Sequence, residues 1–77
     1  MEHITKLSSE IQLNKREALR CQREISHGVD VVRFLRMKPS ASGNLRPVGP
    51  QLAFAAKHLA DVIIALQALR DDAEGRA

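Results

Sequence analysis

The sequence predicts an all-α fold, an antiparallel two-helix hairpin forming a single domain, and three observations support this prediction. Apolar residues recur at three- and four-residue spacings through two long segments, which is typical of amphipathic helices. A stretch rich in proline, glycine and serine separates the two segments at residues 38–50 and would end both helices. The chain has only 77 residues, which allows one domain at most.

The first predicted helix covers about residues 4–36. Its apolar stripe follows a heptad pattern, in which Asn14 is the polar exception. Gly28 lowers the stability of a helix interior by about 1 kcal/mol relative to alanine, so we expect a kink there. The apolar and small residues of this stripe are Ile4, Leu7, Ile11, Ala18, Cys21, Ile25, Val32 and Leu35.

The second predicted helix covers about residues 51–71 and follows Pro50, a residue suited to the first position of a helix. Its apolar stripe is built from leucine, isoleucine, valine and alanine. Acidic residues near its end oppose the helix dipole. We therefore expect residues 72–77 to form a disordered tail.

A hairpin of these two helices leaves apolar residues uncovered, because the first helix is longer than the second. Ile4, Leu7 and Ile11 form the overhang. Exposed apolar patches usually mark interfaces, so the hairpin must self-associate into a bundle such as a homodimer, bind another protein, or do both. Phe34, Phe54 and Ile64 lie outside the stripes; they either pack inside such a bundle or form a separate target-binding surface.

On the predicted first helix, Arg16, Arg20 and Arg23 share one face. Three interpretations stay open for this basic stripe: a solvated face, a site for an acidic protein patch, or a site for phosphates. The chain has two phenylalanines and no tyrosine or tryptophan. This scarcity of aromatic side chains disfavours base stacking, and a nucleic-acid partner is therefore not the expected one.

No pattern indicates catalysis, a cofactor or a metal. The sequence lacks a phosphate-binding loop, a nucleophile with a matching base, and the histidine and cysteine spacing of a zinc site. The single cysteine excludes an intramolecular disulfide and fits a reducing compartment. No signal peptide is evident, and the most apolar run contains charged residues that a lone membrane span would rarely carry. These features indicate a cytoplasmic protein that is not an enzyme.

The junction Gly49-Pro50-Gln51, followed by an amphipathic segment rich in alanine, leucine and isoleucine, resembles that of the small rhizobial quorum-sensing antiactivators of the TraM and QseM types. This resemblance covers roughly residues 2–70 in the order and type of elements. It implies a compact helical protein that binds a LuxR-type transcriptional activator and represses conjugative transfer of mobile elements.

The expected function is therefore that of a non-enzymatic regulator that binds a transcriptional activator. The residues expected to contact the partner are Phe34, Phe54, Ile64, Ile4, Leu7, Ile11, Arg16, Arg20 and Arg23. Two alternatives stay open. The two-helix plan is similar to that of helical-hairpin co-chaperones of type III secretion needles, and it is also similar to nucleic-acid-binding hairpins of the Rop type.

Overall fold

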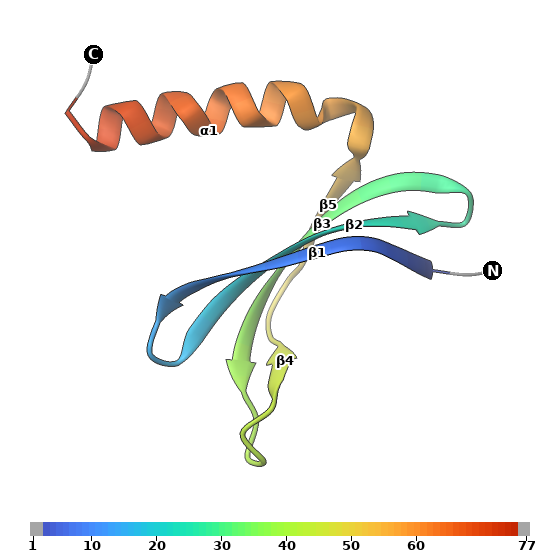
Figure 1. Ribbon diagram of the computed structural model, residues 1–77, viewed down its shortest axis with the longest axis vertical. Helices are drawn as coiled ribbons and strands as arrows, with labels where there is room; N and C mark the ends of the chain where they lie inside the picture. The colour runs from blue at the N-terminus through green and yellow to red at the C-terminus, as the bar shows by residue number, and fades with distance from the viewer. Residues whose placement is uncertain (1–2, 76–77) are drawn as a thin grey trace.

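The structure, a computed structural model that describes residues 3–75, contains an antiparallel β-sheet followed by one α-helix (Figure 1). Strands β1 to β4 lie side by side in chain order, and β5 pairs with β3. A 3₁₀ turn, η1, joins β5 to the helix. The elements are β1 (His3–Asn14), β2 (Glu17–Ser26), β3 (Val29–Pro39), β4 (Leu45–Pro47), β5 (Leu52–Ala55), η1 (Ala56–His58) and α1 (Leu59–Ala73).

The prediction of an all-α two-helix hairpin is wrong. Strands β1, β2 and β3 occupy the place of the first predicted helix, and β4 lies within the predicted loop. The second helix forms only from Leu59 onward, because residues 52–55 pair with β3 instead. The helix continues to Ala73, beyond the predicted start of a disordered tail at residue 72. Residues 76–77 of that tail lie outside the described part of the chain.

Two irregularities in β1 explain why its apolar spacing suggested a helix. The pairing register between β1 and β2 shifts between Thr5 and Leu7 and again between Gln12 and Asn14. An inserted residue changes which side of the sheet the following residues face. Ile4 and Leu7, three residues apart, therefore reach the same face, although a regular strand alternates every residue.

The predicted kink near Gly28 is instead a tight turn between β2 and β3. His27 has φ 52° and Gly28 has φ 79°, and both belong to the left-handed region. Two successive residues of this kind fit a type I′ turn, whose twist matches that of the flanking strands. Glycine at the second position supplies this conformation without steric cost. The residues on either side, Ser26 and Val29, are paired across the hairpin.

Strands β4 and β5 form one interrupted edge strand along β3. Met37 of β3 pairs with Pro47 of β4, and Phe34 of β3 pairs with Leu52 of β5. Residues 48–51 thus lie opposite only two residues of β3, and Gly49, with φ 73°, lies in this bulge. The edge strand thus has two extra residues at this point. Because side chains alternate between the two faces of a sheet, an insertion of two residues keeps the alternation of β4 and β5 in step with that of β3.

The pairing registers define two faces of the sheet. The Glu24 face includes Ala18, Leu35 and Met37, which form the small buried core. The Leu7 face is opposite and includes Val32, which is also buried. A core this small indicates that the isolated chain has modest stability.

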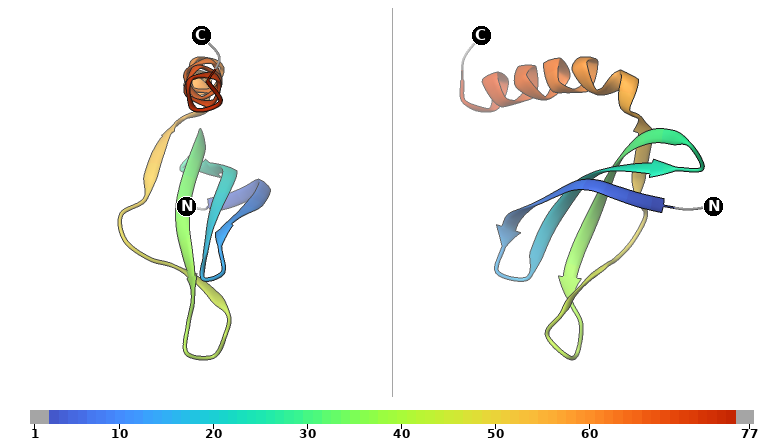
Figure 2. Two further views of the ribbon diagram at one scale, coloured as in Figure 1. Left: turned by 90° about the vertical axis from the view of Figure 1, so that its left-hand side faces the viewer. Right: turned by 45° about the vertical axis from the view of Figure 1, so that its right-hand side comes forward.

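Helix α1 runs across one end of the sheet and extends away from η1 (Figure 1, Figure 2). None of its residues is buried. The end of the sheet away from the helix contains the β1–β2 turn and the β3–β4 loop (Figure 1). The helix end and the far end of the sheet therefore offer two separate surfaces.

Candidate functional site

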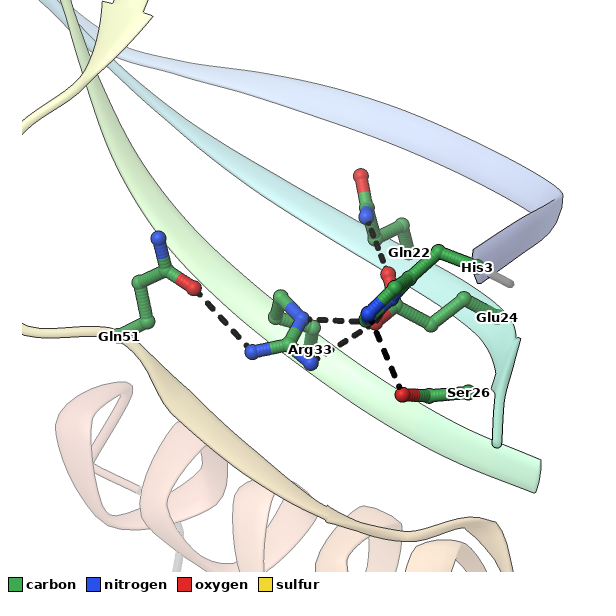
Figure 3. Close-up of polar contacts among 6 residues, drawn as sticks. All are labelled: His3, Gln22, Glu24, Ser26, Arg33 and Gln51. Carbon is green, nitrogen blue, oxygen red and sulfur yellow. Dashed lines mark hydrogen bonds and ion pairs between the residues drawn. The ribbon is translucent and has the colours of Figure 1, made fainter. Parts of the chain in front are cut away.

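A polar network surrounds Glu24, which is only 3% exposed. Arg33 donates from Nε to Glu24 Oε1 at 2.9 Å, and its Nη2 lies 2.8 Å from the same oxygen. Gln22 donates to Glu24 Oε2 at 2.6 Å, and His3 Nδ1 lies 3.4 Å from Oε1. Figure 3 shows Arg33 between Glu24 and Gln51, whose side-chain oxygen accepts from Arg33 Nη1 at 3.2 Å. Mainly because of the Arg33 hydrogen bond, the pKa of Glu24 lies below its usual value.

Every carboxylate of the sheet is paired with one arginine, and Glu24 is the most buried of them. Asp30, for example, accepts two hydrogen bonds from Arg23, at 2.9 and 2.8 Å. Each of these carboxylates is therefore held by an ion pair within the sheet. The four pairs are Glu10–Arg20, Glu17–Arg36, Glu24–Arg33 and Asp30–Arg23.

Four exposed cations remain at the end of the sheet away from α1, and we call this set the basic end. Lys15 and Arg16 form the β1–β2 turn, Lys38 lies near the end of β3, and Arg46 lies in β4. Within residues 3–75 these four side chains make no ion pair with a carboxylate; the salt bridges are the four above and Arg70–Asp71, together with the His3 contact to Glu24. Their charges are therefore available to an anion.

The placement of these cations is unfavourable without such an anion. Lys38 and Arg46 are direct cross-strand partners, and like charges in this position destabilise a sheet. Arg16 and Lys38 also line one surface hollow together with Pro39 and Ser40. Arg36 already holds the carboxylate of Glu17, and this hydrogen bond is the main reason that the pKa of Glu17 is lowered; the charge of Lys38 adds a smaller effect in the same direction. The arrangement is suited to phosphate groups, which cationic side chains bind by charge and hydrogen bonds.

A second surface is apolar. Ile4, Leu7 and Ile11 of β1 lie on the Leu7 face, and Leu7 is 68% exposed. The overhanging helix that was expected to leave them uncovered is absent, because this segment forms a strand. A hollow on this face is lined almost entirely by apolar surface, and it connects the sheet to the first residue of α1. Its lining residues are Leu7, Ser9, Cys21, Gln22, Arg23, Val32, Phe34 and Leu59.

The structure separates the three arginines of the predicted basic stripe. Arg16 lies in a turn, Arg20 lies on the Glu24 face, and Arg23 lies on the opposite face. Arg20 and Arg23 are engaged with Glu10 and Asp30. The helical face that would have united them does not exist, since residues on β2 alternate sides.

The predicted apolar contact residues are partly brought together. Phe34 and Phe54 meet edge to face, with ring centroids 5.8 Å apart, because β5 places Phe54 beside β3. Ile64 lies on α1 and is 63% exposed. The roles of these residues in binding stay predictions.

Sequence reasoning missed Lys15, Lys38 and Arg46. Helical periodicity gave no reason to group residues so far apart in the chain. The signal that could have found them is their position in or beside turns. When the strands pair, these turns come to lie together at one end of the sheet.

No group of three or more histidine, cysteine, aspartate or glutamate side chains within residues 3–75 is placed to hold a metal ion. Cys21 is half-buried on the Leu7 face. Burial raises the pKa of its thiol, which keeps the thiol protonated and a poor nucleophile at neutral pH. Cys21 therefore has the character of a packing residue.

Along residues 3–75, no helix is both long enough and apolar enough to cross a membrane. Comparisons with protein-family profiles, with curated proteins and with solved structures find no match for the chain.

Proposed function

We propose that this chain is a non-enzymatic binding module whose basic end contacts the phosphate backbone of a nucleic acid. The observation that carries the proposal is the set of four unpaired cations at one end of a sheet whose carboxylates are all held by other arginines. Phosphate contacts of lysine and arginine release counterions and dominate affinity for nucleic acids.

This proposal reverses the expectation drawn from the sequence. A helical stripe would have mixed Glu17 and Glu24 with the arginines and weakened their attraction for phosphate. In the sheet, Arg36 and Arg33 hold these two carboxylates. Of the predicted stripe, Arg16 alone belongs to the basic end, where Lys15, Lys38 and Arg46 join it. Within residues 3–75, all four carboxylates of the sheet are held by other arginines.

The contacts are expected to be largely independent of base sequence. The four cations of the basic end are suited to phosphate groups, and phosphate contacts carry no base-sequence information. Both phenylalanines contact each other further along β3 and β5. Binding through charge alone gives weak, salt-dependent affinity, of the order of 10⁻⁴ to 10⁻⁶ M at physiological salt.

The double variant Lys38→Glu/Arg46→Glu tests this function. We expect at least a tenfold loss of affinity for a fluorescent single-stranded oligonucleotide, measured by anisotropy at low salt. The slope of log affinity against log salt should become shallower by about 1.4, since each phosphate contact on a single strand contributes about 0.7. A duplex of equal length, measured in parallel, shows which form is preferred.

The matched control is Lys57→Glu/Arg70→Glu, which changes the net charge equally but lies at η1 and on α1. It should retain most of the affinity. An equal loss in both double variants would mean that only net charge matters, and undetectable binding of the unmodified chain at low salt would refute the proposal.

A second candidate function is the one expected from the sequence, regulation by binding another protein such as a transcriptional activator in the cytoplasm. The observation that favours it is the exposed apolar side chain of Ile64 on α1, accompanied by alanines at positions 60 and 68. The helical-hairpin plan that suggested an antiactivator is absent from the fold, so this candidate depends on that surface alone.

Ile64→Glu tests the second candidate directly. Removing one buried aliphatic anchor costs roughly 1.5–3 kcal/mol, so affinity for a captured partner should fall at least tenfold. The measurement is titration calorimetry with an activator that the unmodified chain retains in a pull-down. Since Ile64 is already exposed, the circular-dichroism spectrum should not change; unchanged affinity would exclude this surface as the docking site.

A further inference from the structure

The apolar surface of this chain extends over both the sheet and the helix. On α1, an apolar stripe runs along one side at helical spacing, starting at Leu59, which lines the same hollow as Leu7. Ile63, Leu66 and Leu69 continue this stripe, and Leu69 is 65% exposed. We call the six exposed members the apolar surface: Ile4, Leu7 and Ile11 of β1, and Ile63, Leu66 and Leu69 of α1.

Helix α1 lacks the packing that a helix of its length needs. It has 15 residues, and none of them is buried. Isolated helices of about 12–15 residues are marginal in water, and most helices in proteins depend on burial of an apolar side. Leu59 contacts the hollow on the Leu7 face, but Ile63, Leu66 and Leu69 stay exposed in a single copy, so α1 requires a further surface against its stripe.

The chain exposes more surface than a compact monomer of its mass, and the excess is close to the area that one partner buries in a protein–protein interface. A compact monomer of 8.5 kDa is expected to expose about 4,700 Å², whereas this chain exposes 5863 Å². The excess is on the order of 1,000 Å², close to the roughly 800 Å² that each partner buries in a stable interface of standard size. The Cα radius of gyration, 14.5 Å, likewise exceeds the roughly 11.5 Å expected for a compact domain of this length.

The distribution of charge points to a second copy of this chain as the partner. Residues 3–55 contain nine lysines and arginines and four acidic residues, whereas residues 56–74 contain two and four. The sheet is therefore positive and the helix negative. In a two-fold pair that lays the helix of each copy over the sheet of the other, the facing elements would have opposite net charge, and such complementarity favours association.

We propose that the apolar surface docks against the same surface of a second copy, so that β1 and α1 of both chains share one interface. A two-fold contact of this kind uses one self-complementary patch twice. It would bury the stripe of α1 and the exposed side chains of β1 together. The proposal is independent of nucleic-acid binding, because its test uses the protein alone.

Sedimentation equilibrium of the full chain at about 5–100 µM tests it, a range that reveals dissociation constants near a micromolar. We expect a mass twice the 8.5 kDa of one chain. Leu7→Glu and Leu66→Glu should each shift the mass to that of a monomer, since both side chains are exposed in one copy and buried only in the pair. A monomeric unmodified chain at the highest concentration would overturn the proposal without reference to any variant.

Matched controls add the same charge next to each site. Ser8→Glu lies beside Leu7 but on the other face of the sheet, and Gln67→Glu lies about 100° around the helix from Leu66. Both should remain dimeric. Ile64→Glu, on the opposite side of α1 from the stripe, should also remain dimeric. Dimers of undiminished stability with Leu7→Glu and Leu66→Glu would place the interface elsewhere and contradict the proposal.

Discussion

Met37→Ala is expected to leave most of the chain unfolded at 25 °C. Met37 is 1% exposed and packs with Ala18 and Leu35 in the core cluster. Truncating a buried methionine to alanine costs roughly 2–5 kcal/mol, because transfer energy is lost and a cavity is left. A single core in a domain of this size rarely provides more than about 3–5 kcal/mol, so the cost approaches the whole stability.

Urea unfolding followed by circular dichroism, at one fixed protein concentration, measures this effect. Met37→Leu is the matched variant, because it keeps the volume and should cost less than about 1.5 kcal/mol. Leu45→Ala truncates a more exposed side chain of β4 and should also be mild. A cooperative Met37→Ala transition at the midpoint of the unmodified chain would show that this cluster is not the main core.

Glu24→Gln is expected to lower the free energy of unfolding by about 2 kcal/mol at pH 7, because the substitution leaves a charged arginine without its carboxylate partner. The shape of the side chain is preserved, so no cavity forms. Arg33 keeps its hydrogen bond to Gln51 and some solvent contact, which limits the loss. Glu10→Gln, in a more exposed ion pair, should cost less than about 1 kcal/mol.

The pH dependence of this variant has a defined sign. The pKa of Glu24 is lower in the folded chain than its usual value of 4.5, because Arg33 stabilises the carboxylate. The stabilisation that ionised Glu24 gives to the folded chain is therefore fully present above the pKa of Glu24 in the unfolded chain. It is lost as the pH falls through the pKa of Glu24 in the folded chain. The difference between the unmodified chain and Glu24→Gln should shrink below pH 4.5. A difference that stays constant from pH 7 to strong acid would contradict this role of the ion pair.

The error in the predicted fold has a local cause that can be stated for particular residues. Ile4 and Leu7 have helical spacing, but a register shift between them puts both on one face of a strand. His27-Gly28 has the turn chemistry of a hairpin, although asparagine or aspartate is commoner than histidine before such a glycine. The valines of β3 and the isoleucines of β1 and β2 favour strands, and this preference was the available signal against a helix.

A helix in the second half of the chain was predicted, although its start was placed too early. The alanine- and leucine-rich segment forms a helix over Leu59–Ala73, consistent with strong intrinsic helix propensity. Its expected beginning was too early, because Leu52 and Phe54 are taken by pairing with β3. Propensity acts on local sequence, whereas this boundary depends on a strand more than fifteen residues away.

The sequence by itself determined the C-terminal helix, the excess of basic residues and the surplus of apolar side chains that one small domain cannot bury. The tertiary structure decided which cations remain unpaired, since Arg36 and Arg33 hold Glu17 and Glu24 only after β2 and β3 are aligned. It also decided that Lys38 and Arg46 lie side by side. The physical reason is that register sets every neighbour in a sheet, and register arises from turns, bulges and long-range hydrogen bonds rather than from the spacing of residues along the chain.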